Sequence, residues 1–186
     1  MLVGCGASQP LLHNSPRSLV LTLSQLPYPG FVVEKGATNT GVISNKKAAA
    51  GERSVLRRYV RQGRQSAYVA TFVREVSPQE VVGPVVIESS VVIYDSAAGA
   101  SSGFSLERQQ LDASGWTRVS TGSLGAEAAA FTESKALDQT QYQSFVVEWR
   151  QANAVNQIRI AGNAATLDIN YALTVARVQE RGEAAK

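Results

Sequence analysis

The sequence contains few of the residues that most often build catalytic and metal sites: it has one Cys, at position 5, and one His, at position 13. A structural zinc site takes about four Cys or His ligands, so the chain cannot build one from these side chains. A single thiol also excludes an internal disulfide. The one candidate for a catalytic His lies beside Asn14 and Pro16, in a polar segment where we expect it to be solvated.

Long apolar runs are also missing, since no stretch reaches the ~18 apolar residues of a transmembrane helix. Charged residues make up 18% and hydrophobic residues 44% of the 186, a composition typical of a globular protein rather than a disordered one. We expect one domain from residue 18 to residue 181, a tether before it at residues 1–17, and a short tail at 182–186.

Apolar patterning along this domain alternates between strand and helix periods. Strands are predicted at residues 18–23, 31–35, 67–75, 85–94, 116–120 and 128–132, and a β-hairpin joins 143–150 to 154–161. Helices are predicted at 53–62, at 96–111 with Asp95 as its N-cap, and at 164–181. These elements predict an α+β fold, in which two or three helices pack on one face of an antiparallel β-sheet in a single domain.

The first residues carry a recognisable motif. Leu2-Val3-Gly4-Cys5 resembles the lipobox of bacterial lipoproteins, a family in which the Cys receives a diacylglyceryl group after the peptide before it is removed. The resemblance implies that Cys5 is the lipid attachment site and that the protein is anchored at the extracytoplasmic face of a bacterial membrane. The Gly, Ser and Pro content of residues 6–17 is typical of a flexible tether behind such an anchor.

Four residues before Cys5 cannot hold the basic region and the apolar stretch of a secretory signal peptide. We therefore expect an in-frame signal sequence upstream of Met1. The alternative is an initiator Met on a cytosolic protein in which Cys5 has no role. A lack of other thiols favours the exported protein, because stray thiols are a liability in an oxidising compartment.

Three further stretches extend the resemblance into the domain. They are an LTL-x-x-LP-x-GF opening (residues 21–31), an S-x-x-GA run (residues 96–100) and a VxWR-x-xN-x-V hairpin (residues 147–155). Together they resemble uncharacterised secreted lipoproteins of the actinobacterial and chloroflexi type, which carry a tethered α+β domain. The order of elements is also similar to the PsbP/Mog1-like fold, which implies an accessory subunit of a membrane protein complex.

Basic residues concentrate between positions 46 and 64, where seven Lys and Arg side chains face a single acid, Glu52. In a helix over residues 53–62, Arg53, Arg57, Arg61 and Arg64 would lie along one stripe. Such a stripe beside a lipidated terminus suggests contact with anionic lipid headgroups or with a partner protein. Nucleic acid is a weaker candidate, since only Tyr59 interleaves with the arginines. A solvated helix face without a binding role remains the alternative.

Catalytic motifs are weak by comparison. Residues 99–103 match the G-x-S-x-G nucleophile elbow, but no His follows to act as the base. Acids such as Glu88, Glu107 and Glu148 are dispersed, and no metal-binding loop or phosphate loop is present. We expect no cofactor and a non-catalytic binding domain. A hydrolase that brings dispersed carboxylates together is the remaining enzymatic alternative.

Overall fold

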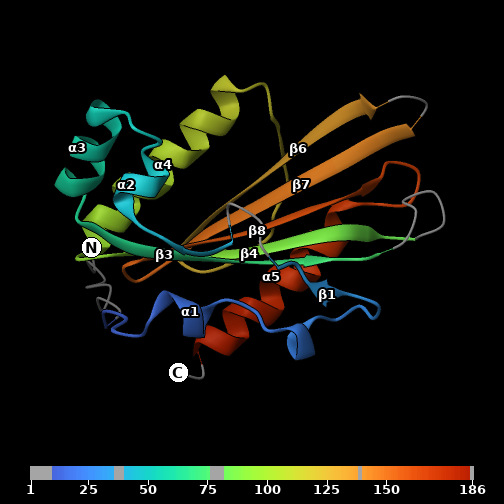
Figure 1. The fold of residues 1–186 in the computed structure, drawn as a ribbon, viewed down its shortest axis with the longest axis horizontal. Helices are drawn as coiled ribbons and strands as arrows, with labels where there is room; N and C mark the ends of the chain where they lie inside the picture. The colour runs from blue at the N-terminus through green and yellow to red at the C-terminus, as the bar shows by residue number, and fades with distance from the viewer. Residues whose placement is uncertain (1–9, 36–39, 76–81, 138–139, 185–186) are drawn as a thin grey trace, which may run out of the picture.

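One antiparallel sheet runs through the whole molecule (Figure 1). The computed structural model describes residues 10–35, 40–75, 82–137 and 140–184. The sheet has eight strands in the order β1-β3-β4-β8-β7-β6-β5, and β2 also pairs with β3. The strands are β1 (Val32–Val33), β2 (Gly41–Ile43), β3 (Arg64–Val73), β4 (Pro84–Tyr94), β5 (Thr117–Val119), β6 (Glu127–Leu137), β7 (Thr140–Gln151) and β8 (Ala154–Asn163).

Helices cover both faces of this sheet. The helical segments are α1 (Pro16–Leu19), a short 3-10 turn (Leu23–Gln25), α2 (Asn45–Ala48), α3 (Arg53–Arg61), α4 (Ala97–Ala113) and α5 (Ile169–Ala184). In Figure 1, α2, α3 and α4 lie above the sheet, and α1 and α5 lie below it. The predicted α+β class with an antiparallel sheet is confirmed, whereas the prediction that the helices share one face is wrong.

Strand alternation explains how two faces are covered, because successive side chains of a strand point to opposite sides. Ile158 and Ile160 of β8 pack in the main core beneath α5, together with Trp149 of β7. Val155 points the other way and packs against Phe104 of α4. The buried residues of α4 include the small Gly99, Ala100 and Gly103, so its sequence gives little indication of the face that it covers.

The N-terminal segment differs from its prediction. Residues 18–23 are not a strand, because Pro16 occupies the start of the short helix α1 and Leu19 packs across the sheet face against Val91 and Ile93. The expected tether also lies against the domain from Leu12 on, whose backbone N–H donates to Asn153 Oδ1 at 2.7 Å. Apolar periodicity alone does not separate a strand from a segment that crosses a sheet face.

Other predicted elements are found close to their expected positions. The hairpin of β7 and β8 pairs Gln151 with Ala154 across a two-residue turn. The helix expected at 53–62 is α3, and the helix expected at 96–111 is α4, whose N-cap is Ser96 rather than Asp95. The last helix begins at Ile169 and continues to Ala184, through most of the expected tail.

Candidate functional site

Three hollows meet at one end of the sheet, where β4 ends at Tyr94 and α4 begins after Ser96. The first, of about 580 Å³, is a groove between α3 and α4. The second, of about 490 Å³, lies beside the N-terminal segment, and the third, of about 250 Å³, lies between α4 and the sheet. Asp95 lines the first two, and Gln62 lines the first and the third. We call this end of the sheet the basic end, because the Lys and Arg side chains of α2 and α3 lie there.

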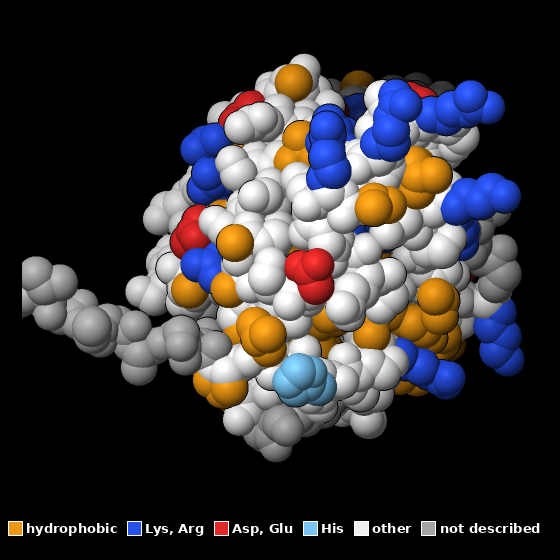
Figure 2. All heavy atoms as spheres, turned by 90° about the vertical axis from the view of Figure 1, so that its left-hand side faces the viewer, with side chains coloured by type: hydrophobic (Ala, Val, Ile, Leu, Met, Phe, Trp, Pro, Cys, Tyr) orange, Lys and Arg blue, Asp and Glu red, His pale blue; other side chains and the backbone are white. Residues whose placement is uncertain are grey.

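Basic residues dominate the helices of this end. Figure 2 looks at it directly and shows Lys and Arg side chains gathered along one side with hydrophobic side chains among them. Arg53, Arg57 and Arg61 are exposed on α3, and Val60 between them is 64% exposed. Helix α2 adds two exposed cations, Lys46 and Lys47.

Within the described residues, none of these side chains forms an ion pair. The ion pairs among the described residues are Arg118 with Asp112, Lys135 with Glu133, and Arg150 with Glu127, and none of them involves α2 or α3. The acids of this end include Glu52, which precedes α3, Asp95 in the groove, and Glu107, which shares the third hollow with Tyr59. The basic charge is therefore available to an external anion.

Arg64, predicted as part of the same stripe, lies elsewhere. Helix α3 ends at Arg61, and Arg64 begins strand β3 with only 8% of its surface exposed. Its guanidinium donates to Asn45 Oδ1 and lies over the ring of Tyr59 at 5.1 Å. The predicted stripe of four is wrong at this position because the chain turns at Gln62 and Gly63 before another helical turn forms. Arg64 instead joins α2, α3 and the sheet.

The groove depends on a close approach of α3 to α4. A Cβ atom at Gly99 would lie 2.2 Å from the backbone oxygen of Gln62, and one at Gly103 would lie 2.0 Å from the hydroxyl of Tyr94. Only glycine permits such contacts. The G-x-S-x-G pattern at residues 99–103 therefore has a packing role inside α4, and it does not form a strand-to-helix elbow.

Polar groups line the floor and the rim of this groove. Arg58 and Arg61 come from α3, and Ser96 and Ser102 come from α4. Within the described residues, Arg58 Nε and Gln62 Oε1 are buried without a hydrogen-bond partner. Ser96 Oγ accepts from the backbone N–H of Gly99 at 3.1 Å and caps α4. The groove therefore offers a ligand the guanidinium groups of Arg58 and Arg61 as donors, and Gln62 Oε1 and the Asp95 carboxylate as acceptors.

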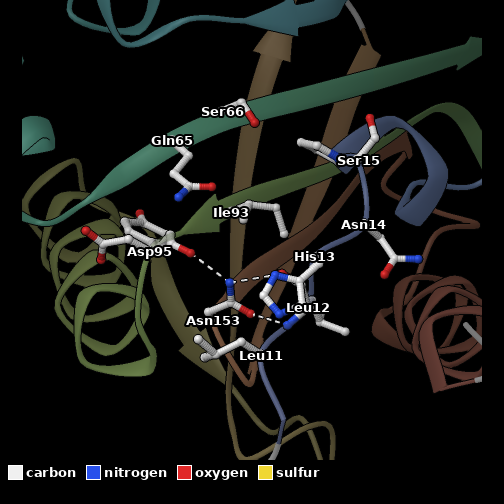
Figure 3. A pocket seen from close by; sticks show the side chains of 12 residues that line it. Leu11, Leu12, His13, Asn14, Ser15, Gln65, Ser66, Ile93, Asp95 and Asn153 are labelled. Carbon is white, nitrogen blue, oxygen red and sulfur yellow. Dashed lines mark hydrogen bonds between the residues drawn. The ribbon is translucent and has the colours of Figure 1, made fainter.

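The hollow beside the N-terminal segment shows how the chain enters the domain (Figure 3). Asn153, in the β7–β8 turn, accepts from the backbone N–H of Leu12 and donates from Nδ2 to the carbonyl oxygens of Leu12 and Tyr94. His13 is exposed at the mouth of this hollow, as its polar surroundings predicted. Asn153 therefore holds the start of the described chain at the basic end.

Two carboxyl groups meet beneath the third hollow, which Glu107 lines. Glu148 of β7 is fully buried, and among the described residues no N–H or hydroxyl group donates to its Oε2. The carboxyl group of Glu107 from α4 lies close enough to hydrogen-bond to that of Glu148 when one of the two is protonated. Gln157 Nε2 donates to Glu148 Oε1 at 2.7 Å. Burial raises the pKa of both carboxyl groups, and the neighbouring charge of Glu107 raises the pKa of Glu148 further. The pair therefore retains a shared proton at neutral pH.

This pair was missed among dispersed acids in the sequence. One signal was present: Glu148 lies inside the apolar run of Val146, Val147 and Trp149, where a charged residue must find a buried partner. The carboxyl groups touch, whereas glycosidases hold theirs at least ~5 Å apart. Among the described residues, no three His, Cys, Asp or Glu side chains form a metal-binding group.

Predicted residues thus fall into three groups. Arg53, Arg57 and Arg61 share the exposed face of α3, Arg64 belongs to the interior, and Cys5 lies outside the described residues. Within the described ranges, none of the helices has the length and apolarity that a bilayer crossing requires.

Comparison with known proteins identifies a solved structure with a similar fold, but it does not assign the chain to a family. No family model matches the chain, and no curated protein matches its sequence. Among solved structures, the crystal structure of the extracellular domain of PknH from Mycobacterium tuberculosis matches with a TM-score of 0.64 and 12% sequence identity. The match covers 96% of this chain and 100% of that domain. The α+β sheet described above is therefore a fold that an extracellular domain also has.

Proposed function

We propose that the chain is an extracytoplasmic, non-catalytic binding domain anchored to a bacterial membrane through a lipid on Cys5. The observation that carries the proposal is the match over 96% of the chain to the extracellular domain of PknH. The lipobox-like Leu2-Val3-Gly4-Cys5 supports the same compartment. So does the scarcity of thiols, which suits an oxidising environment.

The geometry of the described residues supports binding over catalysis. A serine nucleophile needs a base within hydrogen-bond reach, and the serines of residues 99–103 lie in α4 without a His beside them. Of the Glu107–Glu148 pair, Glu107 lines a hollow of about 250 Å³, which is smaller than the ~300–1,000 Å³ of typical ligand sites. The groove and the basic helix α3 are open, as a binding surface requires.

Expression from the native locus, with fractionation and mass spectrometry of the mature N-terminus, tests this function. We expect the protein in the membrane fraction, exposed to protease added outside the cytoplasm, with a diacylglyceryl mass on Cys5. After a high-salt wash, which removes electrostatic attachment, Cys5→Ala should be released from the membrane. The matched control Cys5→Ala/Ser8→Cys keeps one thiol but moves it out of the motif, so it should also be released by this wash. A cytoplasmic protein, or membrane attachment of both variants that resists the high-salt wash, would contradict the proposal.

A further inference from the structure

We infer that the exposed face of α2 and α3 docks on anionic phospholipid headgroups, so that the basic end of the domain faces the membrane. This inference rests on the proposed lipid anchor for its cellular setting. The docking chemistry itself belongs to the described residues. It follows from three observations: where the chain enters the domain, how the charge is placed, and which apolar side chain accompanies that charge.

The entry point fixes which end can face a lipid bilayer. Leu12 is held by Asn153 in the β7–β8 turn, at the basic end. Cys5 precedes Leu12 by seven residues, which span at most about 25 Å when fully extended. A lipid on Cys5 therefore keeps the β7–β8 turn, and the hollow that it borders, within that distance of the membrane surface. The basic end lies near the headgroups, whereas the far tips of β6 and β7 point away (Figure 1).

Positive charge is concentrated on α2 and α3 of this end, and within the described residues it forms no ion pairs. Lys46 and Lys47 on α2 and Arg53, Arg57 and Arg61 on α3 are exposed, and no described carboxylate pairs with any of them. Each Lys or Arg close to an anionic membrane surface contributes about 1 kcal/mol to binding. A single lipid chain holds a protein only weakly, and a basic patch beside it makes the attachment stable.

An exposed apolar side chain accompanies this charge. Val60 is 64% exposed and lies one turn from Arg57 and next to Arg61 on α3. Surface helices that bind membranes combine Lys and Arg with apolar side chains that enter the headgroup boundary. The same geometry is less suited to nucleic acid, because Tyr59, the aromatic residue of α3, lies beneath Arg64 and is not free to stack on a base.

Vesicle binding by the full chain tests the docking without the anchor. The protein carries Cys5→Ser, so that no lipid or disulfide contributes. The probes are vesicles of phosphatidylcholine alone and of phosphatidylcholine with about one-third phosphatidylglycerol, at low and high salt. We expect binding to the anionic vesicles only, weakened at high salt. Arg57→Glu/Arg61→Glu should weaken it by at least about tenfold, and Lys46→Glu/Lys47→Glu should weaken it in the same direction.

A control of equal charge change comes from the opposite side of the sheet. Arg177 and Arg181 are exposed on α5, so Arg177→Glu/Arg181→Glu should retain most of the binding. Equal binding to neutral vesicles, equal loss in this control, or tighter binding to duplex DNA than to anionic vesicles would overturn the inference. Failure of the Cys5 experiment would leave these vesicle results unaffected, so the two proposals fail separately.

Discussion

Glu148 is a carboxylic acid placed where strand β7 otherwise buries apolar side chains. It points to the α4 side of the sheet, lies close enough to hydrogen-bond to Glu107 when one of the two is protonated, and accepts from Gln157. Burial raises the pKa of Glu148 to about 8 and that of Glu107 to about 7, whereas an unfolded chain has its ordinary value near 4.5. Between pH 4.5 and pH 8, the folded protein therefore binds more protons than the unfolded chain, and its free energy of unfolding falls as the pH rises.

Glu148→Gln should remove much of this pH dependence. The Gln side chain that replaces Glu148 has the shape of the protonated acid, and its Oε1 can still accept the hydrogen bond from Gln157 Nε2. The free energy of unfolding of the variant should change little near pH 4.5 and exceed that of the native protein at pH 8, by on the order of 2 kcal/mol. Urea unfolding at both pH values measures it. The control Glu75→Gln removes one exposed charge and should leave the pH profile unchanged. A larger loss of stability at pH 8 than at pH 4.5 would contradict the shared-proton description.

Gly103 lies inside helix α4, where its lack of a Cβ atom allows the close approach of Tyr94. In a solvated helix, replacement of Gly by Ala raises stability by up to ~1 kcal/mol. Here the new Cβ would lie 2.0 Å from the Tyr94 hydroxyl. Gly103→Ala should therefore lower the free energy of unfolding by about 1–3 kcal/mol, measured by thermal or urea unfolding. Ser102→Ala, at the exposed neighbouring position, should be neutral or slightly stabilising. A stabilised Gly103→Ala variant would mean that α4 packs differently.

Helix α5 and the N-terminal segment lie on the same face of the sheet, and a chain of buried polar groups that includes Ser89 of β4 joins them. Ser89 Oγ accepts from the backbone N–H of Leu21 at 2.9 Å and donates to Gln179 Oε1 at 2.6 Å. Gln179 Nε2 then donates to Glu183 Oε1. One hydroxyl of β4 thus orients the segment after α1 and the last turns of α5.

Ser89→Ala should uncouple these elements. It leaves the Leu21 N–H without its acceptor and Gln179 Oε1 without its donor, which costs about 1–3 kcal/mol. Amide hydrogen exchange should show faster exchange at Leu21, and urea unfolding should show the loss of stability. Ser90→Ala is the matched control, because Ser90 points to the other face and lines the small hollow beside α4. Equal effects of the two changes would contradict a specific role for Ser89.

The spacing of apolar residues correctly predicted those strands and helices whose apolar side chains pack on a single neighbouring layer. The alternation of Phe145, Val147 and Trp149 gives the hairpin, and the broad apolar stripe of α5 gives its packing on the sheet. The prediction failed for residues 18–23, where Leu19 and Leu21 are buried across a sheet face instead of within the sheet. It also missed that α4 covers a second face, because three of its four buried residues, Gly99, Ala100 and Gly103, are small. The apolar pattern of a helix does not show which face of the sheet that helix packs against.

The whole molecule has a basic end, and the described part of the chain begins at that end, where Asn153 holds Leu12. Sequence spacing predicted three of its exposed arginines, Arg53, Arg57 and Arg61, because a helix repeats every 3.6 residues. It placed Arg64 wrongly, because α3 ends at Arg61 and the chain turns at Gln62 and Gly63, whose φ is +68°. The groove and the Glu107–Glu148 pair join segments far apart in the chain, and only tertiary structure brings them together.

The orientation of the domain on a membrane is the most direct test of this account. The chain has a single native thiol, so in a Cys5→Ser background a dye can be attached at Val60→Cys on α3 or at Ala136→Cys on β6. With anionic vesicles, the account predicts a blue-shifted, quencher-protected emission from the dye at position 60 and an unchanged emission from position 136. An unchanged signal at position 60, or an equal shift at both positions, would contradict it.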